Sequence, residues 1–240
     1  MSQALTNSTP IRNWPYLALV RKELRGAAGI IVFAAVSQGV FVVGKTNLRN
    51  ANGLKWLGNL SSSAIQPFLQ GEFYSGFVWL SVLFAAALGF WQTLGESLGH
   101  AGTWPFLLHR PVSRRGLILL KLAVGSALVW SLSAAMIVGY ATWAYRTESP
   151  VPFEWSMTHR AWHLWLWPPL IYFGAFLSGL RPARWWGTRL FPLVTSGLLL
   201  FFAVVVPYWL WWPFEASLAA FCDAWFVVAI VSVMSERDFG

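Results

Sequence analysis

Charged residues are scarce in this chain: Asp, Glu, Lys and Arg together make up 11% of its 240 residues, whereas hydrophobic residues make up 57%. Soluble globular domains carry about 25% charged residues, so the composition excludes an ordinary soluble domain and favours a chain that lies in lipid. Acidic residues are the scarcer kind, and the formal net charge is +8. The basic residues lie in short segments between long apolar runs, which favours contact with an anionic membrane surface over nucleic-acid binding.

Cysteine is almost absent. Cys222 is the only one, so the chain can form no internal disulfide and no cysteine-based zinc site. His159 and His163 are spaced as i and i+4 and share a helix face, but the three residues between them lack the Glu of a zinc-protease motif. No third ligand is evident, so we interpret both histidines as interfacial polar residues and expect no metal and no cofactor.

Long apolar runs dominate the rest of the chain. A spanning helix needs about 20 mostly apolar residues, and unpaired backbone groups are too costly in hydrocarbon for open strands. We therefore expect an all-α integral membrane protein, with residues 1–240 forming one domain of six transmembrane helices. The predicted spans are 26–44, 73–95, 122–145, 161–180, 190–214 and 216–235. Pro207 and Pro213 make the last boundary the least regular, and a short re-entrant or interfacial turn is an alternative there.

Lys and Arg are distributed unequally between the two sides that these spans define. Twelve lie in the N-terminal segment, the second and fourth connections and the C-terminal tail, and five lie in the other connections. Because cytoplasmic segments carry the excess of Lys and Arg, both termini are expected in the cytoplasm. Tryptophans near the ends of the runs agree with this placement, since their rings prefer the headgroup level. The expected location is the cell (inner or plasma) membrane, as a multi-pass protein.

Residues 39–46, GVFVVGKT, match the phosphate-binding pattern GxxxxGK[ST]. A working phosphate loop follows a strand, opens a helix and uses residues that tolerate unusual backbone angles. The residues here are bulky and mostly β-branched, and they end an apolar run that is long enough to span. We therefore interpret the match as accidental.

The same run has a second interpretation, a secretory signal peptide. The basic segment RKELR, residues 21–25, precedes it, and residues 35–37 resemble a small-residue cleavage site. The apolar run continues to Gly44, and the charged segment begins late for a signal peptide. Both observations favour a first membrane span.

The connection after the second predicted span carries the most informative functional pattern. It leaves that span at Glu96, passes an apolar stretch at 106–108 and a basic segment at 110–115, and enters the third span near Lys121. Ser113 is well placed to cap the helix that follows. A short element with an apolar side and basic flanks can dock into a groove on a partner protein or lie on anionic headgroups.

This connection resembles the cytoplasmic connection of ABC-2 type transporter permease subunits, in which a Glu is followed by Gly-Thr, an apolar triplet, Pro-Val-Ser-Arg and a downstream Lys. The matching residues are Glu96, Gly102, Thr103, Phe106, Leu107, Leu108, Pro111, Val112, Ser113, Arg114 and Lys121. The RKELR segment is similar to the family's interfacial segment before the first span. Family members often carry several acidic residues around the Gly-Thr, whereas this chain has Gly-His-Ala before it and Trp-Pro after it, which leaves the details of docking open.

The resemblance implies the permease subunit of an ATP-driven ABC transporter, with export as the expected direction and a short interfacial helix before the first span. A separate ABC-type ATP-binding subunit would hydrolyse ATP, the element from Glu96 to Arg114 would couple to it, and a second permease copy or a related permease would complete the path. The chain itself is then expected to hold no catalytic residue. The alternatives are a membrane scaffold or assembly subunit that conducts nothing, and an intramembrane enzyme built on His163 and Asp223.

A few polar or small residues interrupt the apolar spans. Asp223 is the only acidic residue within them. A carboxylate is costly in lipid, so Asp223 either contacts an ion or substrate on the transport path or is tolerated near the outer end of its span, where we expect it to lie. Gly125, Ser126 and Gly139 are expected to let neighbouring helices approach closely.

Overall fold

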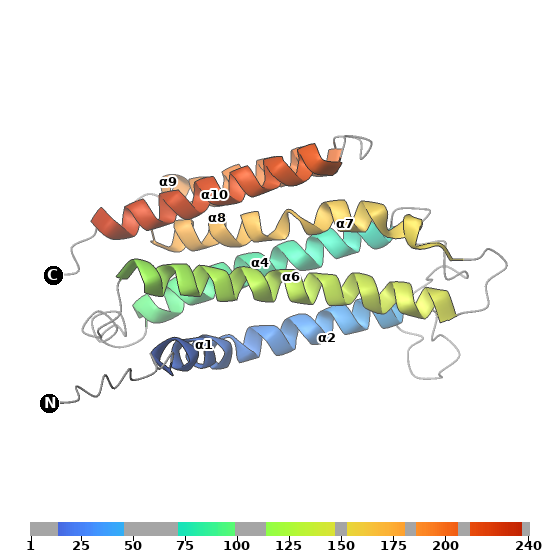
Figure 1. Ribbon diagram of the computed structural model, residues 1–240, viewed down its shortest axis with the longest axis horizontal. Coiled ribbons are helices and arrows are strands. Elements are labelled where there is room, and N and C mark those ends of the chain that lie inside the picture. Colours follow the sequence, from blue (N-terminus) through green and yellow to red (C-terminus); the bar gives the residue numbers. More distant parts are fainter. Residues whose placement is uncertain are drawn as a thin grey trace, which may run out of the picture.

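The computed structural model describes residues 14–45, 72–98, 114–146, 153–180, 186–205 and 212–236. Within these ranges the chain is almost wholly helical and contains no strand. The helices are α1 (Trp14–Gly26), α2 (Ala28–Lys45), α4 (Glu72–Leu98), α6 (Arg114–Arg146), α7 (His159–Trp165), α8 (Pro168–Leu180), α9 (Trp186–Val205) and α10 (Trp212–Glu236), with a short 3₁₀ helix, η3 (Trp155–Thr158), before α7. They form one elongated bundle in which the long helices run side by side (Figure 1).

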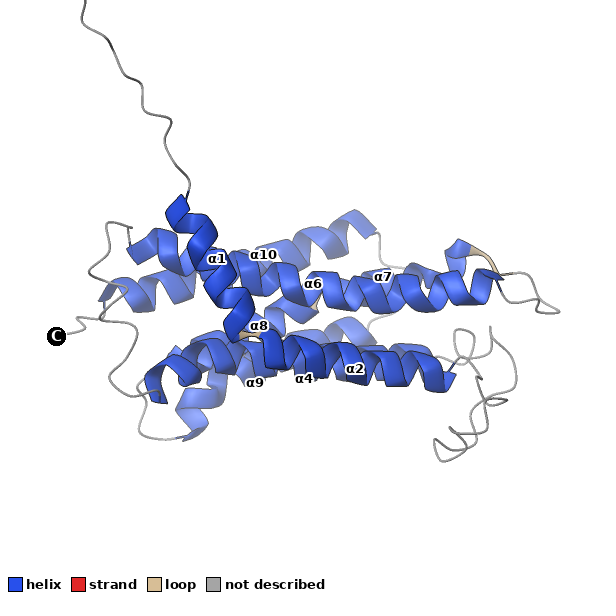
Figure 2. Ribbon diagram, turned by 90° about the horizontal axis from the view of Figure 1, so that it is seen from below, coloured by secondary structure: helices blue, strands red, loops and turns tan. Residues whose placement is uncertain are grey.

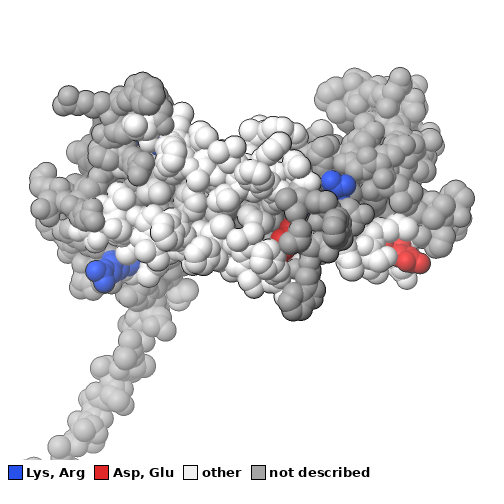
Figure 3. Space-filling view, turned by 90° about the horizontal axis from the view of Figure 1, so that it is seen from above, with Lys and Arg blue, Asp and Glu red and all other residues white. Residues whose placement is uncertain are grey.

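Four described segments are long and apolar enough to cross a membrane. They are Gly76–Leu94, Arg115–Arg146, Thr188–Val205 and Trp212–Ser235. The α1–α2 pair also passes this test, although the two helices meet at a bend of 57°, and Figure 2 shows α1 running obliquely to α2. Uncharged side chains cover most of the described surface on the face drawn in Figure 3, as expected for helices that face lipid.

Helix α8 lies at the centre of the bundle. Every residue of α8 except Gly179 is buried, and the helix packs against α4 on one side and against α9 and α10 on the other (Figure 1). Its approach to α4 depends on a glycine, because a Cβ added to Gly89 would lie 2.6 Å from the carbonyl oxygen of Tyr172. On the opposite side, Gly174 lies against Ser196 of α9. Small residues thus let the backbones meet where lipid offers no hydrophobic driving force.

The predicted fourth span, 161–180, is two helices and not one. The break falls between Trp165 and Pro168, because Pro168 and Pro169 supply no backbone N–H groups to bond to the preceding turn. The Leu166 and Trp167 amides instead form tighter turns, at 3.3 Å and 3.4 Å from carbonyl oxygens three residues earlier. Neither α7 nor α8 alone is long enough to span a membrane.

The predicted boundary between the last two spans is also wrong. We expected the fifth span to continue to Phe214, but α9 ends at Val205 and α10 begins at Trp212. Pro213 therefore lies in the first turn of α10, where its missing N–H has no intrahelical partner to lose. Residues 206–211 lie outside the described ranges. The first three predicted spans correspond to α2, α4 and α6, of which α6 begins eight residues earlier than expected, at Arg114 rather than at residue 122.

The helix ends fall into two groups, which we call the α1 end and the α7 end (Figure 1). Helix α1, the last turn of α4, the first turn of α6 and the last turn of α10 lie at the α1 end. The first turns of α4 and α10 and the last turn of α6 lie toward the α7 end, where α6 and α7 extend beyond α10. The described chain therefore begins and ends on the same side of the bundle.

Candidate functional site

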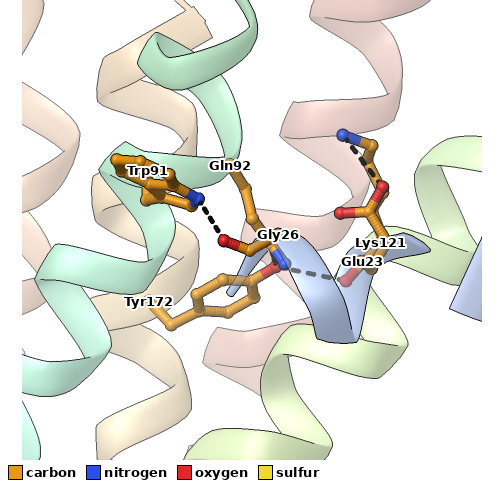
Figure 4. Close-up of polar contacts among 6 residues, drawn as sticks. All are labelled: Glu23, Gly26, Trp91, Gln92, Lys121 and Tyr172. Atoms are coloured by element: carbon orange, nitrogen blue, oxygen red, sulfur yellow. Dashed lines mark hydrogen bonds and ion pairs between the residues drawn. The ribbon is translucent and has the colours of Figure 1, made fainter. Parts of the chain in front are cut away.

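Buried polar side chains from four helices meet toward the α1 end of the bundle. Glu23 comes from α1, Gln92 from α4, Lys121 from α6 and Tyr172 from α8, and none of these residues is more than 8% exposed. Figure 4 shows that they approach one another where the four helices meet. We call this set the four-helix polar cluster.

The Glu23 carboxylate and the Lys121 ammonium form a buried ion pair. Lys121 Nζ lies 3.4 Å from Glu23 Oε1 (Figure 4). Glu23 lies one turn after Leu19 of α1 and one turn before Ala27, which stands in the bend after α1; these three residues are buried, whereas the rest of α1 is mostly exposed. Removing one partner of a buried ion pair leaves an uncompensated charge, so the pair holds α1 firmly against α6.

The Tyr172 hydroxyl joins α8 to α4 and α6. It donates a hydrogen bond to Gln92 Oε1 at 2.5 Å and lies 3.3 Å from the carbonyl oxygen of Lys121. The Tyr172 ring lies directly against Gly125 and occupies the space that a Cβ on residue 125 would need. The prediction that Gly125 allows close helix approach is thus confirmed. The same prediction for Gly139 was wrong, because no atom of the described residues lies within 4 Å of its Cβ position.

Trp91 connects α4 to the bend between α1 and α2. Its indole Nε1 donates a hydrogen bond of 2.9 Å to the carbonyl oxygen of Gly26, the last residue of α1 (Figure 4). The backbone keeps helical bonding through the bend, with Ala27 N bonded to Glu23 O at 2.9 Å. A side chain of α4 therefore supports the bend in addition to the local backbone.

The four-helix polar cluster flanks the connection predicted to couple to an ATPase. Helix α4 ends at Leu98 and α6 begins at Arg114, so Gln92 lies six residues before the end of α4 and Lys121 lies seven residues after the start of α6. The structure describes only the backbones of Glu96, in the last turn of α4, and of Arg114. The other predicted coupling residues lie outside the described ranges: Gly102, Thr103, Phe106, Leu107, Leu108, Pro111, Val112 and Ser113.

Sequence reasoning missed most of the four-helix polar cluster. Lys121 and the RKELR segment each contributed to the family resemblance, but no pattern linked Lys121 to Glu23. The available signal was the spacing of Leu19, Glu23 and Ala27, which places the glutamate on the one buried stripe of α1. Gln92 and Tyr172 stand inside apolar runs, where a single uncharged polar residue has no periodic signature.

We expected Asp223 near the outer end of its span, but it lies near the middle of α10. It is eleven residues after Trp212 and thirteen residues before Glu236, the bounds of the helix. It shares a face of α10 with the buried residues Ala219 and Phe226. Its Oδ1 atom is buried and has no hydrogen-bond partner among the described residues. Such a carboxyl group is costly, and in a membrane helix it is a candidate contact for a polar ligand.

A second polar contact joins α7 to α10. His163 Nδ1 contacts Glu215 Oε2, and Trp167 Nε1 donates a hydrogen bond of 3.4 Å to Glu215 Oε1. Glu215 lies in the first turn of α10, where the helix dipole favours a negative charge. His163, predicted only as an interfacial polar residue, thus has a carboxylate partner 52 residues away in the sequence. Among the described residues no group of three His, Cys, Asp or Glu side chains is placed to hold a metal ion.

Replacing Glu215 with alanine is expected to lower the stability of the protein by about 2 kcal/mol, because His163 and Trp167 lose an acceptor in a mostly buried place. Thermal unfolding of the purified protein in detergent micelles, followed by tryptophan fluorescence, measures the change. Glu154→Ala removes an exposed carboxylate and serves as the control, with an expected change within about 0.5 kcal/mol. Equal effects of the two substitutions would contradict the assigned contact.

The segment that matches the phosphate-binding pattern belongs to a regular helix. α2 continues without interruption from Ala28 to Lys45 and so includes residues 39–45. Its backbone amides are therefore engaged in the helix and do not form the loop that would surround a phosphate. The interpretation of this match as accidental agrees with the observed backbone.

No family model, curated protein or solved structure matched this chain in sequence or fold comparisons. The structure itself defines the class: a helical membrane protein, with four described helices long and apolar enough to cross a bilayer, or five when the bent α1–α2 pair is counted as one. Its distinguishing features are the four-helix polar cluster, the contact between α7 and α10, and the Asp223 carboxyl oxygen, which has no hydrogen-bond partner in the described ranges.

Proposed function

We propose that this chain is the membrane-spanning permease subunit of an ATP-driven ABC transporter, acting in export, in which a separate ABC-type ATP-binding subunit hydrolyses ATP. The observation that carries the proposal is the buried Glu23–Lys121 ion pair. It connects the two segments of the chain that resemble the ABC-2 permease family, the RKELR segment and the residues that follow the predicted coupling element. Contact between these two segments would let a movement of the coupling element reach α1.

The proposed mechanism is a rigid-body movement that passes from the coupling element into the helices. Lys121 lies two turns into α6, whose first residue, Arg114, is the last residue of the element. Because Lys121 is paired with Glu23, a displacement of the first turns of α6 also moves α1. The hydrogen bond between Tyr172 and Gln92 extends the connection to α8 and α4. ATP binding then favours one arrangement of packed helices over another.

The charge distribution supports placing the α1 end in the cytoplasm. Arg21, Lys22 and Arg25 are exposed on α1, and Arg115 is exposed in the first turn of α6. The α7 end instead carries exposed or half-buried aromatic rings, among them Trp143, Trp155, Trp162 and Trp165. Basic residues on the cytoplasmic side and aromatic rings at the interface are the usual pattern for an inner or plasma membrane protein.

Purification of the tagged full-length chain from its native membrane in mild detergent tests the proposal. An ABC-type ATP-binding subunit is expected to co-purify in a near-equal amount, and the complex is expected to hydrolyse ATP, whereas the chain alone does not. ATP hydrolysis by the isolated chain would count against a permease. Failure to recover an ATP-binding subunit with the chain, even in the mildest detergent that extracts it, would count against a permease as well. The absence of ATP-dependent flux in vesicles that contain the complete complex would favour the scaffold alternative.

Replacing Phe106, Leu107 and Leu108 together with aspartate is expected to uncouple ATP hydrolysis from transport. Charged side chains cannot occupy an apolar groove on the ATP-binding subunit, so ATP-dependent flux is expected to fall about tenfold or more, within the range of typical coupling energies. Membrane insertion is expected to stay unchanged. Replacement of the same three residues with methionine keeps the apolar surface and is the matched control. Undiminished flux in the aspartate variant would contradict the coupling role.

A further inference from the structure

Three polar side chains are buried on α2, α4 and α6, one on each helix. Gln38 is 5% exposed, and Ser81 and Ser133 are each 1% exposed. Gln38 Nε2 and Ser81 Oγ have no hydrogen-bond partner within the part of the chain that the structure describes. Ser133 donates to the carbonyl oxygen of Val129 at 2.5 Å, which leaves its own oxygen free to accept. We call these three residues the polar seam.

Two contacts fix how α2 and α4 lie against each other. Near the α1 end, Trp91 Nε1 binds the carbonyl oxygen of Gly26. Nearer the α7 end, the Phe41 ring lies over Gly76, in space that a Cβ would occupy. Fifteen residues separate Gly26 from Phe41, and fifteen residues likewise separate Gly76 from Trp91. Equal spacings mean that the two antiparallel helices stay in register between the contacts. The two contacts therefore set the register of α2 against α4 to within about one helical turn.

This register places the members of the polar seam at one level of the bundle. Gln38 is level with residue 79, so Ser81 lies only about 3 Å further along the helix axis. Ser81 follows Phe77 by one turn on α4, and Ser133 precedes Ile137 by one turn on α6. Phe77 and Ile137 belong to the same hydrophobic cluster, and α4 and α6 are antiparallel neighbours. The two serines therefore occupy adjacent turns of the same interface.

Groups of this kind are expensive to bury without partners, especially where lipid surrounds the helices. Leucine and alanine would fill the same space without that cost. Buried water commonly bonds to two to four such polar groups, which matches the number of side chains in the polar seam. The three side chains carry amide and hydroxyl groups and no charge, so they suit an uncharged hydrogen-bonding ligand better than an ion.

We propose that the polar seam is a water-binding site inside the helix bundle, part of an aqueous path between α2, α4 and α6. The proposal does not depend on an ATP-binding partner.

Aqueous access to the polar seam can be measured with introduced cysteines. Cys222 is the only cysteine, so Cys222→Ser provides a cysteine-free background for Ser81→Cys and Ser133→Cys. The full chain in liposomes is treated with 2-(trimethylammonium)ethyl methanethiosulfonate, whose fixed charge confines it to water, and modification is followed by intact mass. Both cysteines are expected to react at least about tenfold faster than Leu88→Cys, since only a hydrated thiol ionises readily. Leu88 is equally buried on α4, at 0% exposure, within an apolar cluster.

Rates at Ser81→Cys and Ser133→Cys equal to the Leu88→Cys rate would overturn the proposal. Two independent positions on different helices keep the test valid if one variant fails to fold. A second measurement places Gln38→Leu in the Ser81→Cys chain. Leucine cannot bind water, so labelling is expected to slow toward the Leu88→Cys rate while the thermal unfolding midpoint is unchanged or higher. An unchanged labelling rate with a lower midpoint would show that the Gln38 amide serves structure alone, against the proposal.

Discussion

Replacing Lys121 with methionine is expected to destabilise the protein by about 3–5 kcal/mol, a large fraction of the net stability of a typical folded protein. Lys121 is 2% exposed and Glu23 is 8% exposed. Methionine fills a similar volume but takes away the ammonium group that faces the buried Glu23 carboxylate. The thermal unfolding midpoint in detergent micelles, followed by tryptophan fluorescence, measures the loss.

Two further variants separate the ion pair from general effects of the substitution. The double variant Glu23→Met with Lys121→Met removes both charges of the pair, and it is expected to recover most of the lost stability because neither charge is left buried alone. Arg25→Met removes an exposed cation of the same helix as Glu23, and it is expected to change stability by less than about 0.5 kcal/mol. A double variant as unstable as Lys121→Met alone would show that loss of pairing is not the cause.

Replacing Gly89 with valine is expected to cost about 3 kcal/mol or more, because the side chain has no room between α4 and α8. A Cβ at this position would lie 2.6 Å from the carbonyl oxygen of Tyr172 and 2.9 Å from Cβ of Ala175. The first neighbour is backbone, so it cannot rotate away, and the two helices must separate. Separation would also loosen the packing around the Tyr172 hydroxyl, which bonds to Gln92. The midpoint of thermal unfolding reports the change.

Gly139→Ala is the matched control for Gly89. Both glycines lie inside helices, but within the described part of the chain the Cβ position of Gly139 meets no atom within 4 Å. Alanine restricts the unfolded chain and suits a helix better than glycine, so Gly139→Ala is expected to stabilise the protein by about 0.5–1 kcal/mol. Opposite signs for the two substitutions would support the close contact between α4 and α8. A stabilising Gly89→Val would refute it.

The helical class and the approximate positions of α2, α4 and α6 were predictable from the sequence. Each of these helices comes from an uninterrupted apolar run, and the length of such a run is a local property that needs no knowledge of neighbours. The same reasoning failed at 161–180, because hydropathy does not register that Pro168 and Pro169 stop the backbone bonding of one helix. It failed again near Phe214, since aromatic residues are equally apolar in a helix and in a connection.

The candidate sites were much less predictable than the spans. Asp223 was singled out as an unusual residue, because an acidic residue within an apolar run is visible in the sequence. The position of Asp223 near the middle of α10 depends on where that helix begins. The tryptophan-rich stretch before the helix gave no clear sign of its first residue. Glu215 was not paired with His163, because the two are far apart in the chain and neither has a spacing that points to the other. The coupling residues around Phe106 remain a prediction from the resemblance.

Composition and run lengths alone determined that this is a helical membrane protein with basic segments between its apolar runs, because burial in lipid requires long apolar stretches and closed backbone hydrogen bonding. Only the tertiary structure decided which polar residues share an interface: Glu23 with Lys121, Gln92 with Tyr172, and His163 with Glu215. The physical reason is that helix packing depends on rotation and register. A difference of one residue turns a side chain by about 100° around the axis, and that rotation is set by the glycines and rings of neighbouring helices.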